Sequence, residues 1–580
     1  MAKKWRIHPH DPVRVRELEE TAGVSAVVAQ LLLCRGICDP TAARTFLDTR
    51  LSDLRDPESL PGATRAAEII HRAVQAGSKI VIYGDYDVDG MAATAILLKC
   101  LRLLGSEAAY YVPHRGDEGY GLHADALVKL AADGAQLVIS VDCGIGSVAE
   151  AAAAKRLGLE LIITDHHEPG AELPDAAAIV HPRLPGSAYP FGGLCGAGVA
   201  FKLAWALCQQ ASQAKRVGEA MRNYLLEAVA LAALGTVADV VPLVDENRIL
   251  VCHGLRGLKR PSLGLAALLK VTGLSDKPAL SCEDIGFTLA PRLNAAGRLG
   301  QARLAIELLT TGNESRAADL AEYLHQLNDS RQSLERSIYL SANKQAAEHF
   351  DPHADAALVL ADRGWHPGVI GIVAGRLAEK HHRPVVMVSL DEAGLRPGIG
   401  SARSVPGFNL HAALAACGEH LISHGGHAAA AGLRIEESRL DGFRAEFCEH
   451  AAAEIAVEDR LAELWIDAEA PLGALTLGAV DQIERLAPFG HGNARPLVCA
   501  TGVTLAGPPK RIGGGGRHLS LKLSQHGVSL RAVAFGGGDW HDELAGASGP
   551  LAVAFRPIIN DYRGRRSVEL QLTDWRLAEA

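Results

Sequence analysis

The chain has 580 residues and a formal net charge of −9; 48% of its residues are hydrophobic and 5% are aromatic. This composition is typical of a soluble globular protein, and the length predicts three or four domains because single cores rarely grow so large. No uninterrupted apolar run reaches about 18 residues, which argues against a membrane span, and residues 1–14 lack the apolar core of a signal peptide. Eleven cysteines without a C-x-x-C pair favour reduced thiols, and therefore a cytoplasmic location, over a disulfide framework.

The first half of the chain has the pattern of an α/β domain. Residues 1–60 are predicted to form an N-terminal helical segment, and residues 61–312 alternate apolar strand-like runs with Ala-rich helical segments. This rhythm predicts a parallel, doubly wound sheet. Three predicted strands end in an aspartate, namely Asp85, Asp142 and Asp165. Ligands bind outside the carboxyl ends of strands in such sheets, so these acids are expected at one sheet edge.

The second half is predicted as a long helix and two further domains. Residues 313–350 carry one amphipathic pattern with Asn313 as the predicted N-cap, and a helix of ~35 residues is long enough to bridge two domains. Residues 351–458 form a second α/β segment. Residues 459–580 change to period-two strands separated by glycine-rich turns, which predicts a small all-β barrel. The expected fold class is therefore α/β, with two α/β domains joined by a long helix and followed by a barrel.

The segment GDYDVDG (residues 84–90) places three carboxylates at alternate positions, namely Asp85, Asp87 and Asp89. Alternate residues of an extended strand lie about 6.7 Å apart on one side, so ionised carboxylates there repel one another unless a cation lies among them. A divalent metal with hard oxygen ligands is the simplest explanation. The segment does not fit an EF-hand, because the twelfth position counted from Asp85 is Ile96 and a strand-like run replaces the entering helix.

Further candidate ligands follow other elements, namely Asp142, the Asp165-His166-His167 triplet and Asp239. Each alone indicates little, because a strand-terminal aspartate is often only a helix cap and a His-His pair on a loop is more often solvated than liganding. Together, hard-oxygen ligands and imidazoles at one sheet edge are typical of a two-metal site for Mn2+ or Mg2+. Only one adjacent residue, Cys143, carries a thiol, so a cysteine-based zinc site is disfavoured.

These motifs resemble the DHH phosphoesterase superfamily, and SHGGHAAAAG (residues 423–432) resembles the signature of its DHHA1 companion domain. Other segments are similar to the RecJ single-strand-specific 5′ exonucleases, namely LLLCRGICDPTAARTFLD, PHRGDEGYGL, APRLNAAGRLG, GWHPGVIGIVAGRL and GSARSVPGFNL. The resemblance spans nearly the whole chain. It implies a DHH catalytic domain over residues 61–312, a connecting helix over 313–350, a DHHA1 domain over 351–458 and an OB-fold-like nucleic-acid-binding domain over 459–580.

The resemblance also implies two Mn2+ or Mg2+ ions held by six side chains. Asp142 would bridge the ions, because one carboxylate can offer an oxygen to each. One shell would be completed by Asp89, His166 and Asp239, and the other by Asp85 and Asp87. In related pyrophosphatases a histidine precedes the position of Asp87 by four residues, whereas this chain has Tyr83. This departure leaves open whether Asp85 or water fills the histidine's place.

The implied chemistry is an in-line hydrolysis of a phosphodiester. Two ions would lower the pKa of a shared water, and the 3′ oxygen would leave. His167 would face the scissile phosphate and stabilise charge in the transition state. Asp165 would orient the neighbouring histidines as a hydrogen-bond acceptor.

The resemblance further implies that Arg115, Ser401 and Arg403 bind the 5′-terminal phosphate. An alternative for Arg115 is a loop salt bridge with Asp117 or Glu118. A second group is predicted to contact the DNA backbone, with polar contacts between domains as the alternative for its first three members: Arg292, Asn294, Arg298, His424 and His427. For the two histidines, an H-x-x-H zinc half-site is the competing interpretation, and no further ligand clusters near them in the sequence.

The sequence therefore predicts a metal-dependent 5′-to-3′ exonuclease that degrades single-stranded DNA to 5′-mononucleotides in recombination and repair. The resemblance implies a monomer that works with a single-strand-binding protein and a RecQ-type helicase, without a membrane partner. One alternative is a DHH-family phosphodiesterase of cyclic dinucleotides or short oligoribonucleotides, which would not need the β-module. Another is a non-catalytic nucleic-acid-binding relative, against which the complete set of metal-type acids argues.

Overall fold

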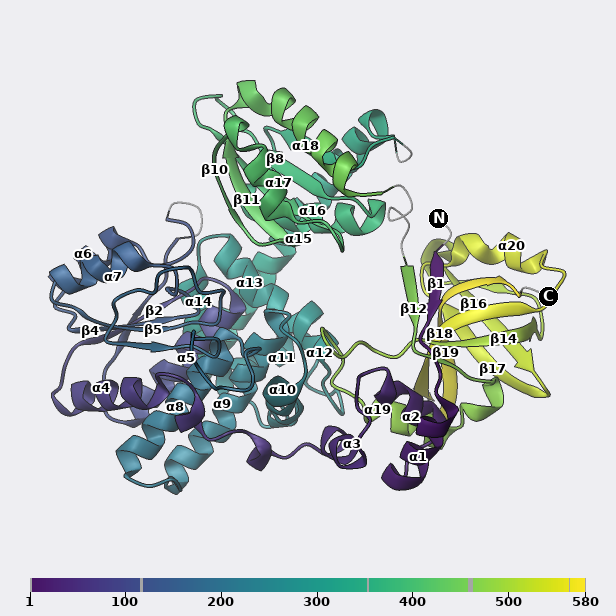
Figure 1. Ribbon diagram of the computed structural model, residues 1–580, viewed down its shortest axis with the longest axis horizontal. Coiled ribbons are helices and arrows are strands. Elements are labelled where there is room, and N and C mark those ends of the chain that lie inside the picture. The colour runs from purple at the N-terminus through teal and green to yellow at the C-terminus, as the bar shows by residue number, and fades with distance from the viewer. Residues whose placement is uncertain (1–2, 115–117, 352–353, 457–462, 563, 579–580) are drawn as a thin grey trace. The chain divides into compact units, whose positions relative to one another are not determined.

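The computed structural model describes residues 3–114, 118–351, 354–456, 463–562 and 564–578 (Figure 1). These residues divide into two units, one made of Leu54–Val241 with Asp245–Ala462, the other of Met1–Asp53, Pro242–Val244 and Glu463–Ala580. Among the described residues, no helix combines the length and the apolarity that crossing a bilayer requires.

A five-stranded sheet with the order β3-β2-β4-β5-β6 forms the centre of the first α/β domain, and all its strand pairs are parallel. Its strands are β2 (Ile80–Gly84), β3 (Ala109–Tyr111), β4 (Leu137–Val141), β5 (Glu160–Thr164) and β6 (Ala178–Val180). Strands β2 and β4 are buried along their whole length, as expected for apolar runs covered by helices. The parallel sheet confirms the prediction from the alternating pattern.

Helices connect these strands and continue after the last of them, and three helix ends reach the carboxyl edge of the sheet. They are α4 (Ala63–Gln75), α5 (Val88–Leu103), α6 (Ala124–Ala132), α7 (Val148–Arg156), α8 (Gly196–Ser212), α9 (Glu219–Ala238), α10 (Asp245–Gly257), α11 (Leu263–Val271), α12 (Cys282–Asp284), α13 (Ala290–Arg298) and α14 (Ala302–Thr310). Short turns are η2 (Pro57–Ser59) and the π-helix η3 (Ile285–Leu289). Helix α5 packs against both α8 and α9.

Helix α15 (Glu314–His349) has 36 residues and lies between the two α/β domains in sequence. The side chain of Asn313 accepts a hydrogen bond from the backbone N–H of Arg316, which confirms the predicted N-cap. The first half of α15 packs on α11, α13 and α14, and its second half packs on α16 (Pro367–His381) and β7 (Leu358–Asp362).

The second α/β domain contains a sheet of order β10-β11-β9-β8-β7, in which only the β7–β8 pair is parallel. Besides β7 and α16, its elements are β8 (Val385–Ser389), β9 (Gly398–Arg403), β10 (Leu421–Gly426), β11 (Ala430–Ile435), α17 (Leu410–Ala416), α18 (Leu440–Glu454), η4 (Gly418–His420) and η5 (Glu437–Arg439). Its core is built around the buried rings of Phe408, Phe443 and Phe447.

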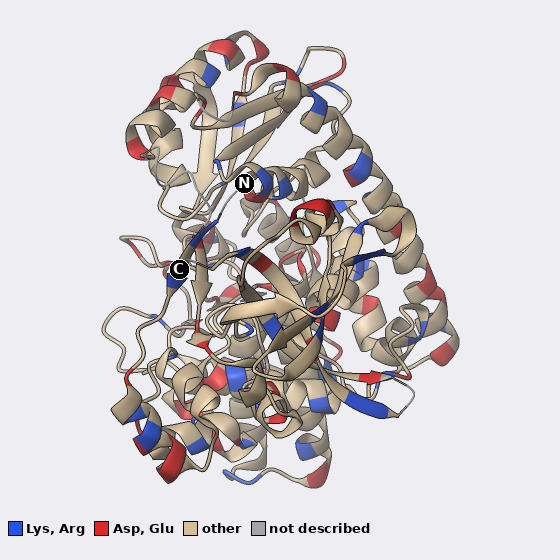
Figure 2. Cartoon of the chain, turned by 90° about the vertical axis from the view of Figure 1, so that its right-hand side faces the viewer, with Lys and Arg blue, Asp and Glu red and all other residues tan. Residues whose placement is uncertain are grey.

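A seven-stranded sheet with the order β13-β14-β18-β19-β17-β16-β15 forms the C-terminal β-domain, and an additional β14–β16 pairing closes it. Its elements are β13 (Ala468–Glu469), β14 (Val498–Leu505), β15 (Lys510–Ile512), β16 (His518–Gln525), β17 (Val528–Ala534), β18 (Leu551–Tyr562), β19 (Arg565–Leu577), η7 (Leu472–Ala474), η8 (Gly514–Gly516), η9 (Gly538–Trp540), α19 (Leu477–Glu484) and α20 (His541–Ala545). Along β16, Leu519, Leu521 and Leu523 point inward while Lys522 is exposed, as the period-two pattern predicts. Figure 2 shows basic residues along the strands of this domain.

The N-terminal residues belong to the same unit as the barrel. They form β1 (Lys4–Ile7), α1 (Pro12–Ala22), α2 (Ala26–Leu33), α3 (Pro40–Leu47) and η1 (Leu51–Asp53). Strand β1 pairs in parallel with β12 (Glu463–Ile466). The sequence pattern predicted only helices here, because a four-residue strand whose partner lies at the other end of the chain leaves no local signal.

Candidate metal centre

The predicted ligands follow the carboxyl ends of three neighbouring parallel strands. Asp85 follows β2, Asp142 follows β4, and Asp165 with its two histidines follows β5. Asp87 is the N-cap of α5, and Asp239 is the C-cap residue of α9. Of the aspartates at the strand ends, Asp165 does not cap a helix, because its carboxylate accepts from the N–H groups of Ile145, His166 and His167.

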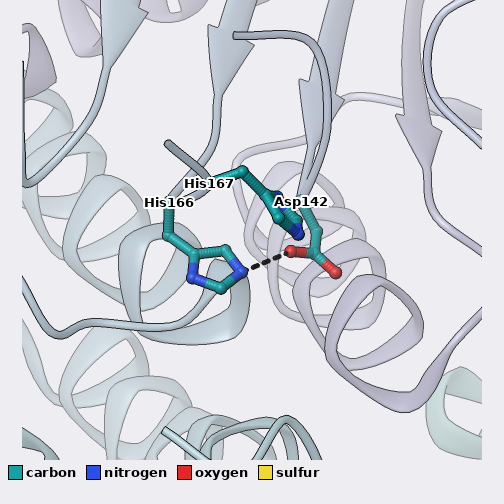
Figure 3. Close-up of side chains that lie close together, drawn as sticks. All are labelled: Asp142, His166 and His167. Carbon is teal, nitrogen blue, oxygen red and sulfur yellow. Dashed lines mark ion pairs between the residues drawn. The ribbon is translucent and has the colours of Figure 1, made fainter. Parts of the chain in front are cut away.

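The structure gathers these side chains into overlapping groups whose possible ligand atoms lie within 4.8 Å of one another. The groups are Asp89, His166 and Asp239; Asp85, Asp87 and Asp142; and Asp142, His166 and His167. Nε2 of His166 lies 3.1 Å from Oδ1 of Asp142, and Figure 3 shows this ring directed at the Asp142 carboxylate. The same atom lies 3.6 Å from Asp239 and 3.8 Å from Asp89. His166 is buried, unlike the solvated histidine that was its alternative.

Burial and crowding make the charged forms of these acids costly. Burial, followed by the neighbouring Asp89 carboxylate, raises the pKa of Asp142 well above its usual range and raises the pKa of Asp239 to about 9. Burial also raises the pKa of Asp89 and lowers the pKa of His166 to about 4, so this imidazole is neutral at pH 7. A cation among these groups would reverse the effect on the acids.

The donor set fits Mn2+ or Mg2+. Oδ1 of Asp142 and Nε2 of His166 are buried and have no hydrogen-bond partner among the described residues, although they face each other. Such atoms are costly unless another partner satisfies them. Carboxylate oxygens with a neutral imidazole are ligands that suit Mn2+ and tolerate Mg2+. The neighbouring thiol of Cys143 belongs to an apolar core cluster instead of the ligand groups.

Two helices bring backbone groups close against the acids. At the start of α8, the N–H groups of Gly196 and Ala197 donate to Asp89 at 2.6 and 2.9 Å. A Cβ atom on Gly196 would lie 2.6 Å from Oδ1 of Asp142, and one on Gly235 of α9 would lie 2.4 Å from Oδ1 of Asp89. The sequence analysis did not identify these positions. The sequence feature that could have indicated them is the run CGAG (residues 195–198) at a helix start. Its role becomes apparent only when α8 and α9 are packed against α5.

Comparison with known proteins identifies the family. The models for "DHH family, N-terminal domain", "DHHA1 domain" and "RecJ OB domain" match residues 79–233, 354–453 and 466–574. The chain is 38% identical to the single-stranded-DNA-specific exonuclease RecJ of Bacillus subtilis, over 99% of this chain and 71% of that protein. The chain belongs to the RecJ family of single-stranded-DNA-specific exonucleases. The fold class predicted from the sequence, with DHH, DHHA1 and OB domains, is confirmed.

Two further relatives support the assignment. RecJ of Dickeya dadantii is 36% identical over 96% of each chain. The crystal structure of RecJ from Thermus thermophilus in complex with Mn2+ superposes with a TM-score of 0.84 at 32% identity, covering 100% of this chain and 80% of that one.

In this RecJ-family chain, Tyr83 does not take part in the ligand groups. Its side chain is fully buried in an apolar cluster with Leu122 and Val138, and its hydroxyl donates to the carbonyl of Gly121 at 3.2 Å. Asp85 joins Asp87 and Asp142 in one group of possible ligands, and its occupation of the missing histidine's place stays a prediction.

Asp165 contacts His167 as the RecJ resemblance implies. Nδ1 of His167 lies 2.7 Å from Oδ1 of Asp165. Although burial opposes both shifts, this hydrogen bond lowers the pKa of Asp165 to about 2 and raises the pKa of His167 to about 9. His167 also faces the DHHA1 domain, because its ring is stacked with that of His427 at a centroid distance of 6.4 Å.

The predicted DNA-contact residues of this RecJ chain lie in three places, and Arg115 is outside the described residues. Ser401 and Arg403 lie together on β9, with Nη1 of Arg403 donating to Oγ of Ser401 at 3.1 Å. Both approach α16 closely at Gly371, where an added Cβ would lie 2.8 Å from Oγ of Ser401. His424 lies on β10, its ring 6.2 Å from that of His411. Neither His424 nor His427 belongs to a metal-type group among the described residues, so a zinc half-site gains no support.

The residues of the RLNAAGR motif make protein contacts in this structure. Arg292 donates to His325 and to the carbonyl of Thr288, and Arg298 donates to the carbonyl of Gly368 in the DHHA1 domain at 3.1 Å. Oδ1 of Asn294 accepts from the N–H of Val88 at 3.1 Å, between two candidate metal ligands. A DNA contact for these three side chains therefore stays a prediction beside the observed domain contacts.

Proposed function

We propose that this RecJ-family chain degrades single-stranded DNA from its 5′ end in the 5′-to-3′ direction and releases 5′-mononucleotides. The observation that carries the proposal is the convergence of five aspartates and one imidazole at the carboxyl edge of the first sheet. The likeness in fold to a RecJ crystal structure with Mn2+ supports the same assignment.

The site would hold two Mn2+ or Mg2+ ions. Asp142 would be shared between them, with Asp89, His166 and Asp239 on one side and Asp85 and Asp87 on the other. When bound, the ions supply an activated water and stabilise charge on the attacking and leaving oxygens. The orphaned Oδ1 of Asp142 and Nε2 of His166 support this assignment.

The chain's own residues would orient the substrate and stabilise charge. Because the pKa of His167 is raised to about 9, both of its ring nitrogens carry a proton at pH 7. Nδ1 faces Asp165, so the N–H at Nε2 is the donor left to interact with the scissile phosphate. Arg115, Ser401 and Arg403 would bind the 5′-terminal phosphate, since arginine matches phosphate in a bidentate manner. Contacts to the DNA backbone would come from Arg292, Asn294, Arg298, His424 and His427.

The proposal also covers the cellular location, the partners and the domain limits of the chain. We infer a cytoplasmic monomer acting in DNA recombination and repair, with a single-strand-binding protein and a RecQ-type helicase as partners. We also propose the domain limits 1–60, 61–312, 313–350, 351–458 and 459–580 as functional boundaries. The match of residues 466–574 to a RecJ OB domain argues against a phosphodiesterase of cyclic dinucleotides, for which such a module has no evident use.

A labelling experiment tests the polarity. With Mn2+, single strands labelled at the 5′ end should release labelled mononucleotide at once, whereas 3′-labelled strands should release it last and a blunt duplex should stay intact. A strand with a 5′-hydroxyl end should be degraded more slowly than one with a 5′-phosphate. Asp142→Ala serves as the inactive control. Early release of the 3′ label, or unchanged activity of the control, would contradict the proposal.

A further inference from the structure

Tyr120 lies beside the candidate metal centre and has no role assigned so far. Its hydroxyl is 3.1 Å from the backbone carbonyl oxygen of Asp142 and 2.9 Å from Nδ1 of His167. Its ring meets the His167 ring edge-on, with centroids 5.4 Å apart and planes at 66°. One hydroxyl therefore joins two residues that reach the site from different strands, and Figure 3 shows these two residues next to each other.

The hydrogen-bond directions at this hydroxyl are consistent. A backbone carbonyl only accepts, so the tyrosine proton goes to the oxygen of Asp142. Nδ1 of His167 carries a proton because it faces the ionised carboxylate of Asp165 at 2.7 Å. The oxygen of Tyr120 then accepts from the same N–H, so Asp165 and Tyr120 share this donor, and Nε2 stays free of this network.

The contact to Asp142 falls on a strained part of the backbone. Asp142 has a φ of 62°, a left-handed conformation that non-glycine residues seldom adopt. Its N–H donates to the carbonyl of Thr164 at 2.9 Å, and its carbonyl accepts from Tyr120. The backbone N–H and C=O of Asp142 are thus both hydrogen-bonded, the N–H to a backbone carbonyl and the C=O to the side chain of Tyr120.

The segment that carries Tyr120 is itself fastened to the sheet. The hydroxyl of Tyr83, on β2, donates to the carbonyl of Gly121. On the other side of Tyr120, the carboxylate of Glu118 accepts from the hydroxyl of Tyr111 and from the N–H of His114. Tyr83 stands where related pyrophosphatases carry a histidine, so in this chain that position supports the loop instead of offering a ligand.

We propose that Tyr120 is a positioning residue for the exonuclease reaction, and that Tyr83 supports it. Its hydroxyl holds the backbone of Asp142 in the orientation that metal binding needs, and it holds His167 in the orientation that phosphate contact needs. This inference rests on the proposed metal-dependent function of the site.

Tyr120→Phe tests the inference because it removes one oxygen and keeps the ring. We expect Mn2+ affinity in the absence of DNA, measured by calorimetry, to fall about tenfold. At saturating Mn2+, kcat on single-stranded DNA should fall about tenfold while KM stays within twofold. Tyr110→Phe is the matched control, because the hydrogen bond of its hydroxyl among the described residues goes to the carbonyl of Arg303 at 3.4 Å, away from the candidate ligands, and it should behave as the wild type.

The outcomes separate positioning from direct DNA binding. A residue that only contacts DNA would raise KM and leave Mn2+ affinity unchanged, and that result would overturn the inference, as would a variant with wild-type values. Failure of the wild-type chain to bind Mn2+ and to cleave DNA would instead defeat the proposed function. Thermal melting confirms that each variant is folded.

Tyr83→Phe provides a second, independent test through the loop. We expect kcat and Mn2+ affinity to fall about threefold, and the double variant with Tyr120→Phe to be no worse than Tyr120→Phe alone. Additive losses would show that the two tyrosines act separately and would overturn the supporting role of Tyr83.

Discussion

Asp142→Asn is expected to abolish exonuclease activity while making the metal-free protein more stable. Asn keeps the shape but removes the charge that two cations would share, so turnover should fall by more than about 1,000-fold. In EDTA at pH 7 the same change relieves a carboxylate whose pKa burial and neighbouring acids raise well above its usual range. Because this pKa is higher in the folded than in the unfolded state, the group's contribution to stability is present below the unfolded pKa and is lost as the pH rises toward the folded pKa, a loss that Asn does not have.

The measurement is thermal melting with EDTA and with Mn2+, beside a nuclease assay. In EDTA, we expect the midpoint temperature of the variant's first unfolding transition to lie about 2 °C or more above that of the wild type. Mn2+ should raise the melting temperature of the wild type more than that of the variant. As a matched control, Asp133→Asn changes a C-cap residue of α6, remote from the carboxyl edge, and should alter neither property. A variant less stable than the wild type in EDTA would contradict the electrostatic argument.

Gly235→Ala should inactivate the enzyme although it adds a single methyl group. The new Cβ would lie 2.4 Å from Oδ1 of Asp89 and 2.6 Å from Cβ of Ala197, so either the carboxylate or α8 must move. Displacement of a reacting group by about 1 Å can cost about 100-fold in rate, and we expect a loss of at least that size on single-stranded DNA.

Gly257→Ala is the control for this substitution, because it also lies in a helix but its new Cβ would meet no atom closer than 3.6 Å. This variant should retain full activity. Circular dichroism and melting should show that Gly235→Ala still folds, and binding of Mn2+ should be weakened in parallel with activity. Full activity of Gly235→Ala would mean that the space around Asp89 is looser than the structure indicates.

The candidate ligands at strand ends could be placed from the sequence because each follows a local run of apolar residues. Asp85, Asp142 and Asp165 follow apolar runs, and parallel strands bring such ends to one edge. The sequence analysis also named Asp239 as a candidate, although it ends a helix instead of a strand, and its place in one metal shell was implied by the family resemblance. No comparable sequence pattern indicated the residues that support these ligands. Gly235, Gly196 and Tyr120 act through atoms of residues distant in sequence, and these contacts depend on how helices pack and where a loop is fastened.

Two further features could not be decided from the sequence for the same reason, since they depend on contacts between residues far apart in the chain. For Arg298 the sequence left a DNA contact and a polar contact between domains both open; in the folded chain it donates to the carbonyl of Gly368 in the neighbouring domain, and the DNA contact stays a prediction. The strand β1 is four residues long, and its partner begins at Glu463. Pairing over such a separation is decided by the whole fold and not by periodicity.

That pairing governs how the barrel could be studied in isolation. The apolar side chains of Leu18, Val28 and Leu32 share a cluster with Ile483 and Leu486, so the N-terminal helices shield part of the β-domain from water. A fragment cut at Glu463 would leave this surface bare. A permuted polypeptide that continues from residue 578 through a flexible tether into residues 3–53 would keep the shield in place.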